Sequence, residues 1–144
     1  MKHYQNILVA VSISLHAKAL IARAQDIQQL SQARLQLAHV LDDHRMVYAG
    51  GEFALTLKTT LDSNAAHQIH NQLLQLAIAC QLQPHECHLV HGEKANELVE
   101  LVNKLRIDLL VVGAHHKQGF RCLLGSTAES LLHALPCDIL MVKQ

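Results

Sequence analysis

A strand, a glycine-bearing loop and a helix start follow one another between Asp108 and Thr127, and together they predict a site for an anion or a nucleotide. The apolar run Leu109–Val112 is typical of a buried strand. It ends at Gly113, and the loop beyond it leads to Gly125-Ser126-Thr127, just before a helical pattern. The free N–H groups and the positive dipole end of a helix start favour a bound phosphate.

Each of these residues also has a purely structural interpretation. Ser126 and Glu129 have the spacing of a capping box, so Ser126 can cap the helix without any ligand. Gly113 can simply let the chain turn out of the sheet. The basic loop residues Lys117 and Arg121 suit a phosphate, and they equally suit an ordinary solvated loop.

The histidines and cysteines of this loop and of the rest of the chain give weaker indications of a functional site. His115 and His116 are adjacent, which is not a metal-ligand spacing, and no metal site is predicted. Cys122 is either a redox thiol near the basic loop residues or a small side chain packed at the loop base. The four cysteines form neither a C-x-x-C motif nor a paired framework, which favours reduced thiols in a cytoplasmic protein.

The elements that must position this loop alternate between strand and helix along the whole chain. The predicted strands are Ile7–Val11, Ala33–Val40, Cys87–His91, Leu109–Val112 and Ile139–Val142. The predicted helices are Leu15–Leu30, about Asp62–Leu82, Ala95–Leu105 and Ser126–Leu135. In the first helix the apolar residues near helical spacing are Leu15, Ala19, Ala22, Ile27 and Leu30. The weakly patterned stretch Asp42–Leu61, with Gly50-Gly51, predicts a turn or flexible loop.

This alternation predicts one α/β domain over residues 1–144, with a parallel sheet covered by helices on both faces. In such sheets ligands bind beyond the carboxyl ends of the strands, where the winding direction reverses. The formal net charge is zero, so nothing in the overall charge points to nucleic acid or an anionic membrane. We also expect no signal peptide or membrane span, because the apolar runs are too short.

Several catalytic signatures are absent from the sequence: G-x-G-x-x-G after the first strand, the P-loop, H-E-x-x-H and G-x-S-x-G. Instead the order of elements, NILVAVS at Asn6–Ser12, LAHV at Leu37–Val40 and the stretch Val111–Lys143 resemble the universal stress protein family. The resemblance covers essentially the whole chain. It implies a doubly wound, Rossmann-like fold of five parallel strands in the order 3-2-1-4-5.

The family's nucleotide-binding branch carries Gly-x-x-Gly-x9-Gly-[Ser/Thr] after strand four and an aspartate at the end of strand one. Gly113 and Gly125-Ser126 fit this pattern, whereas His116 replaces the second glycine and the loop is one residue short. Ser12 stands where the aspartate is expected, which disfavours bound Mg²⁺. Val40 fits the position whose backbone contacts adenine. The resemblance thus implies Val40, Gly113, Gly125, Ser126 and Thr127 as the residues for ATP or AMP, if the site is retained.

The last strand predicts a partner. In the order 3-2-1-4-5 it is a sheet edge, and an apolar edge without proline invites another strand. Since family members pair this strand across a two-fold axis, we expect a homodimer through Asp138–Lys143. Three functions follow: a homodimeric stress-response module without catalysis and with no certain cofactor; an ATP- or AMP-binding sensor using the Gly113–Thr127 loop; and an enzyme with slow ATP hydrolysis or autophosphorylation, which Ser12 argues against.

Overall fold

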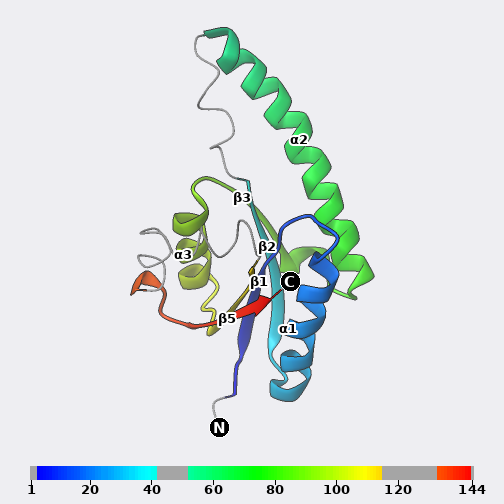
Figure 1. Ribbon diagram of the computed structural model, residues 1–144, viewed down its shortest axis with the longest axis vertical. Coiled ribbons are helices and arrows are strands. Elements are labelled where there is room, and N and C mark those ends of the chain that lie inside the picture. Colours follow the sequence, from blue (N-terminus) through cyan, green and yellow to red (C-terminus); the bar gives the residue numbers. More distant parts are fainter. Residues whose placement is uncertain (1–2, 42–51, 115–132, 144) are drawn as a thin grey trace.

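The computed structural model describes residues 3–41, 52–114 and 133–143, and their centre is a five-stranded parallel sheet (Figure 1). The strand order is β3-β2-β1-β4-β5, which confirms the predicted doubly wound fold. The strands are β1 (Asn6–Ala10), β2 (Arg34–Leu41), β3 (Cys87–His91), β4 (Leu109–Ala114) and β5 (Asp138–Lys143). The helices are α1 (Ala17–Ser31), α2 (Glu52–Ala79) and α3 (Lys94–Lys104), with a 3-10 turn, η2 (Pro84–Glu86). His133 and Ala134, before β5, are also helical.

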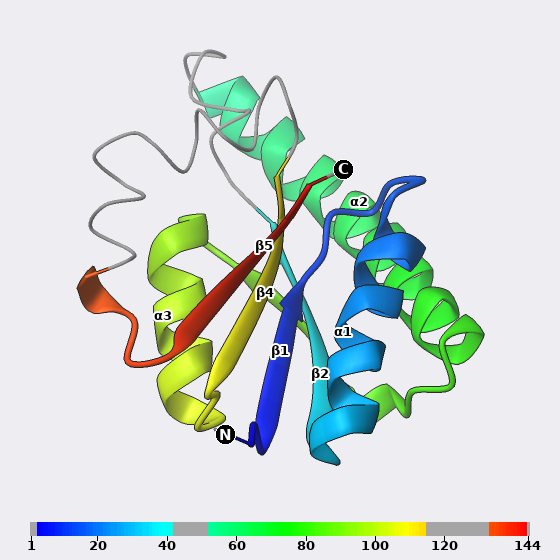
Figure 2. The same ribbon diagram turned by 60° about the horizontal axis from the view of Figure 1, so that its bottom comes forward.

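Helices cover both faces of the sheet, as the sequence predicted. Figure 2 shows α3 on one side of the sheet and α1 with α2 on the other. The strands serve both layers because successive side chains point to opposite faces. In β1, for example, Ile7 and Val9 join the cluster under α1 and α2, while Leu8 joins the cluster under α3. These three side chains are fully buried.

The helix predicted over Leu15–Leu30 is present as α1, but most of the apolar residues that indicated it do not lie on its buried face. Leu15 precedes the helix and is 98% exposed, and Ala19, Ala22 and Leu30 also face solvent. The buried positions are Ala17, Leu20, Ile21 and Ala24, with Ile27 partly buried against the same cluster. These residues follow the i, i+3, i+4, i+7 spacing of one helix face. Two apolar stripes compete in this sequence, and the position of the sheet selects the second.

Helix α2 begins well before the predicted start near Asp62. It runs from Glu52 for 28 residues, so the expected loop over Asp42–Leu61 is wrong for its second half. Figure 1 shows the first part of α2 extending past the sheet. Nearer the sheet, Leu73 and Ala77 of α2 are buried. The expected turn at Gly50-Gly51 lies outside the described residues, as does most of the expected helix Ser126–Leu135.

Of the helices that the structure describes, none combines the length and apolar character needed to cross a membrane.

Asp108, just before β4, ties together the amino ends of three strands. Its carboxylate accepts hydrogen bonds from the backbone N–H of Gln5, at 2.8 Å, and of Asn6, at 3.0 Å. Its own N–H donates to the carbonyl of Asn6, and its carbonyl accepts from the N–H of Asp138. This residue therefore helps to set how β1, β4 and β5 start relative to one another.

We expect Asp108→Ala to lower the free energy of unfolding by about 1–3 kcal/mol, because two backbone donors lose a charged acceptor. Asp108→Asn keeps one oxygen and should cost less. Asp26→Ala is the matched control, since Asp26 is exposed and only approaches Arg23 on the surface of α1 at 4.0 Å. Urea denaturation followed by circular dichroism measures all three variants. Equal losses for Asp108→Ala and Asp26→Ala would contradict the anchoring role.

Candidate functional site

The candidate site lies where β1 ends between its two neighbours, β2 and β4. The last paired residue of β1 is Ala10, which lies opposite Ala38 of β2 and Val112 of β4. Since the order is β3-β2-β1-β4-β5, the winding reverses between β1 and β4. This is the place where open α/β sheets bind ligands.

Two of the predicted nucleotide-binding residues come together at this point. Val40 lies two residues beyond the last β1–β2 pair, and Gly113 lies one residue beyond the last β1–β4 pair. Both are partly exposed, and they border the end of β1 from opposite sides. The other three, Gly125, Ser126 and Thr127, lie outside the described residues. Contact of any of the five with a nucleotide stays a prediction.

The backbone of Val40 is directed toward the space beyond β1. The N–H of Val11 donates to the carbonyl of Ala38 at 2.9 Å, so the polar backbone groups of Ala38 point toward β1. Backbone groups along a strand alternate between its two neighbours, and the groups of Val40 therefore point the same way. Because the paired part of β1 stops at Ala10, Val40 presents a donor and an acceptor past the end of that strand.

His39 is a residue of this edge to which the sequence interpretation gave no role. Its ring Nδ1 lies 2.6 Å from the carbonyl oxygen of Val11, on the first residue after β1. A carbonyl oxygen only accepts, so Nδ1 carries the hydrogen in this bond. Leu35, Leu37 and His39 occupy alternate positions of β2 on the α1 and α2 face. In the sequence, a polar residue that follows two apolar residues at alternate strand positions is the signal that could have indicated a role for His39.

The ring of His39 is kept neutral by its surroundings. Partial burial lowers the pKa of His39 below its ordinary value of 6.5, and the positive charge of Lys94 at the start of α3 lowers it further. The hydrogen bond to Val11 opposes both effects but does not reverse them. Near pH 7 the ring is therefore neutral and carries one N–H, which is the donor on Nδ1.

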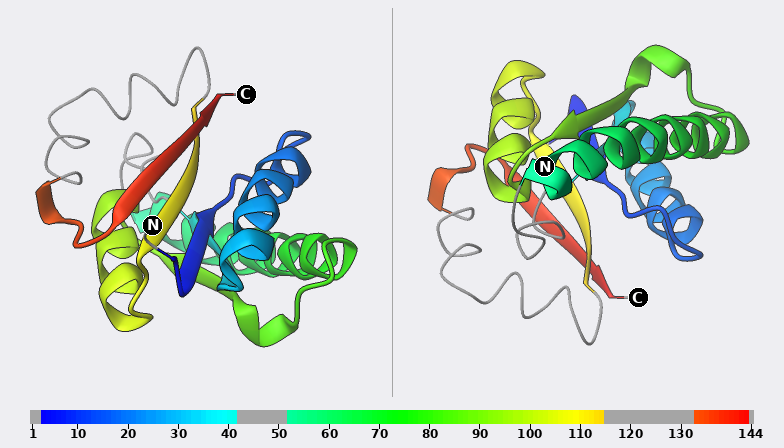
Figure 3. Two further views of the ribbon diagram at one scale, coloured as in Figure 1. Left: turned by 90° about the horizontal axis from the view of Figure 1, so that it is seen from below. Right: turned by 90° about the horizontal axis from the view of Figure 1, so that it is seen from above.

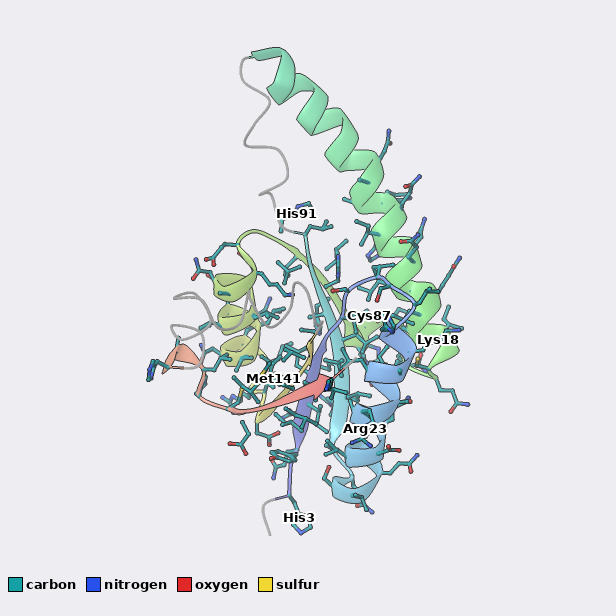
Figure 4. All side chains as sticks on the ribbon, viewed as in Figure 1. His3, Lys18, Arg23, Cys87, His91 and Met141 are labelled. Atoms are coloured by element: carbon teal, nitrogen blue, oxygen red, sulfur yellow. The ribbon has the colours of Figure 1, made fainter. Side chains whose placement is uncertain are left out.

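The described acids that follow β3 are Glu93, at the N-cap position of α3, and Glu97, in the first turn of that helix. Ser12, at the position of the expected aspartate, is exposed. His91, labelled in Figure 4, stands at the carboxyl end of β3, and Lys94 follows it in the chain. No group of three or more histidine, cysteine or acidic side chains in the described ranges is arranged to hold a metal ion. The hypothesis of a redox thiol at Cys122 falls outside those ranges.

A second, half-buried histidine lies on the opposite face of the sheet, away from this edge. Nε2 of His88 in β3 lies 2.8 Å from Oε1 of Gln36 in β2, and Gln36 is itself buried. Burial lowers the pKa of His88, and the charge of Lys104 in α3 lowers it further. This pair joins β2 to β3 beneath α3, so its role is structural.

Acidification from pH 7.5 to pH 5.5 should destabilise the wild-type protein more than His88→Gln. In the unfolded chain His88 takes up a proton near pH 6.5, whereas the folded pKa is lower. The stability from this group is therefore present above the unfolded pKa and is lost as the pH falls toward the folded pKa. Glutamine keeps a donor for Gln36 and does not titrate. Urea denaturation at both pH values measures this; the same loss in the two proteins would contradict it.

Comparisons with known proteins agree with this architecture. The model of the universal stress protein family matches residues 3–143. Universal stress protein A homolog 1 of Coxiella burnetii is 34% identical over 140 residues, which cover 97% of this chain and 96% of the relative. Universal stress protein A of Escherichia coli is 27% identical over 139 residues, or 96% of this chain and 94% of the relative.

Solved structures share the fold over the full length. Universal stress protein UspA from Lactobacillus plantarum superposes with a TM-score of 0.71 at 26% identity and covers 99% of both chains. A universal stress protein solved in complex with cAMP gives a TM-score of 0.67 at 23% identity, covering 99% of this chain and 98% of the other. The family match over nearly every residue, together with the strand order, shows that this chain belongs to the universal stress protein family.

Proposed function

We propose that this protein is a cytoplasmic, homodimeric stress-response module that acts by association rather than by turnover. The observation that carries the proposal is the outer edge of β5. This strand lies outside β4 at the end of the sheet (Figure 3). Its middle residues, Ile139 to Val142, are apolar and include no proline, and Met141 is 40% exposed. Such an edge offers unpaired backbone groups to a second strand.

The direction of the β5 backbone groups follows from its first bond to β4. The N–H of Asp138 donates to the carbonyl of Asp108, so the backbone of Asp138 faces inward. By alternation, the backbone groups of Leu140 and Val142 face β4, while those of Ile139, Met141 and Lys143 face outward. Two copies of this strand could pair through the outward groups around a two-fold axis.

Light scattering of the purified protein at micromolar concentration tests this association. We expect a mass of twice the 16.0 kDa chain. A monomeric mass under these conditions would count against the proposal. The absence of turnover is tested separately by phosphate release from ATP and by transfer of labelled phosphate to the protein. We expect neither, because Ser12 provides no carboxylate to hold a metal ion at the end of β1.

A second candidate function is the binding of ATP or AMP at the end of β1. The observation that favours it is the outward-directed backbone of Val40 opposite Gly113, at the reversal point of the sheet. A polar backbone edge of this kind suits an adenine ring, which has both donors and acceptors on its rim. The cAMP complex of a protein with the same fold is consistent with it.

Calorimetric titration with ATP, with and without Mg²⁺, and with AMP tests this second function. Identification of any nucleotide released on denaturation completes the experiment. Micromolar binding that Gly125→Val abolishes would assign nucleotide sensing to this protein. Millimolar or no binding, with no nucleotide released, would leave association as the function. Binding accompanied by ATP hydrolysis would instead support an enzyme.

A further inference from the structure

We propose that His39 is a positioning residue, which holds the exit of β1 so that the backbone of Val40 stays open to a ligand. This inference rests on the second proposed function for its ligand, the adenine nucleotide. It rests on the geometry of β1 and β2 for the role of His39 itself. Three observations carry it: the ring contact to Val11, the end of the strand pairing at Ala10, and the direction of the Val40 backbone.

A regular parallel ladder would continue the pairing of β1 with β2 at this point. After the N–H of Val11 donates to the carbonyl of Ala38, the next bond of the ladder would join the carbonyl of Val11 to the N–H of Val40. The imidazole of His39 contacts that carbonyl instead, at 2.6 Å. In the place where the ladder would bring the N–H of Val40, the side chain thus supplies a donor to one of the two lone pairs of the Val11 carbonyl.

The backbone bonds of Val11 also fix where the following chain departs. Strand β1 leaves the sheet here, and Ser12 and Ile13 lead toward α1. With its N–H bound to Ala38 and its carbonyl bound to His39, Val11 is held to β2 from both sides of its backbone. The chain therefore departs at a defined residue, one beyond the last registered pair, so that β1 itself does not continue between Val40 and Gly113.

A histidine suits this place because its ring donor reaches the Val11 carbonyl. The ring reaches the Val11 carbonyl from the α1 and α2 face, where Leu35 and Leu37 precede it on β2. Its surroundings include Lys94, whose charge discourages a proton on the second nitrogen. A neutral ring with its hydrogen on Nδ1 makes the single bond that the geometry requires. Asparagine carries a donor at nearly the same distance from the backbone, whereas the donor of glutamine lies one carbon further out.

Hydrogen exchange of the backbone amides in D₂O, followed by NMR, tests the positioning role without any nucleotide. In His39→Leu the Val11 amide should exchange about five to ten times faster, as expected for the loss of one hydrogen bond. The amide of Asp138, bound to Asp108 at the far end of the sheet, is the internal reference. His39→Asn should exchange like the wild type at Val11, and His39→Gln should resemble His39→Leu.

Several outcomes would overturn the positioning role. One is an unchanged Val11 exchange rate in His39→Leu. Another is an equal increase at Val11 and Asp138, which would mean that His39 only contributes to global stability. If His39→Leu does not fold, the comparison of His39→Asn with His39→Gln decides, and equal exchange in these two would also overturn it.

Titration of the same variants with ATP and AMP separates this inference from the nucleotide proposal. If the wild type binds neither nucleotide, the nucleotide function fails, while the exchange rates still decide whether His39 holds the end of β1. If the wild type binds, we expect at least about fivefold weaker binding in His39→Leu and near wild-type binding in His39→Asn. Unchanged binding in His39→Leu, despite faster exchange at Val11, would overturn the link between His39 and the ligand site.

Discussion

Met141→Pro is expected to convert the protein from a dimer into a folded monomer. The backbone N–H of Met141 faces away from β4, so proline removes a donor only from the open edge of β5. Losing at least two intermolecular backbone bonds, together with the steric block of the ring, should raise the dimer Kd roughly 30-fold or more. Light scattering across a dilution series measures the change, and Figure 4 shows Met141 on this strand.

Two controls separate the backbone effect from other consequences. Met141→Ala removes the exposed side chain and keeps the N–H, so it should weaken the dimer much less. Leu140→Pro places the same ring where the N–H faces β4, and it should destabilise the fold itself by about 3 kcal/mol. A dimer that survives Met141→Pro with unchanged Kd would show that association uses another surface.

Ile21→Ala is expected to lower the free energy of unfolding by about 2–5 kcal/mol. Ile21 is fully buried in the cluster that α1 and α2 form with one face of the sheet. The substitution removes buried methyl groups and leaves a cavity that the surrounding strands fill only partly. Urea denaturation followed by circular dichroism measures the loss.

Leu15→Ala is the matched control for this prediction. Leu15 is 98% exposed and precedes α1, so its truncation should change the stability by no more than about 0.5 kcal/mol. The pair tests the two competing apolar stripes of this segment directly. A larger loss for Leu15→Ala than for Ile21→Ala would mean that the helix packs its other face against the sheet.

Much of the fold could be predicted because local patterns and tertiary packing agree. The spacing of Leu98 and Val102 marks the buried face of α3, and both side chains are buried there. The continuous apolar run Leu109–Val112 predicts a strand covered on both faces, and β4 indeed lies between β1 and β5. In α3 and β4 only one orientation of the element against its neighbours removes its apolar side chains from water.

Prediction from the sequence failed where the local apolar pattern is compatible with two buried faces, or where it marks no face at all. The segment before and within α1 has apolar residues on two faces, and only the position of the sheet decides that Ile21 is buried and Leu15 is not. The first part of α2, from Glu52, has no clear stripe in the sequence. Helix formation propagates one residue at a time from an established turn, so a helix can extend there without an amphipathic pattern.

By itself the sequence determined the α/β class, the order of strands and helices, and the family to which the chain belongs. It also pointed to Val40 and Gly113, because the ends of parallel strands meet at one edge of the sheet. Only the tertiary structure decided that these two residues flank the end of β1, and that His39 contacts Val11 there. The physical reason is that strand pairing joins residues that are distant in the chain. The residue at which the pairing of two strands ends therefore cannot be recognised from the sequence around it.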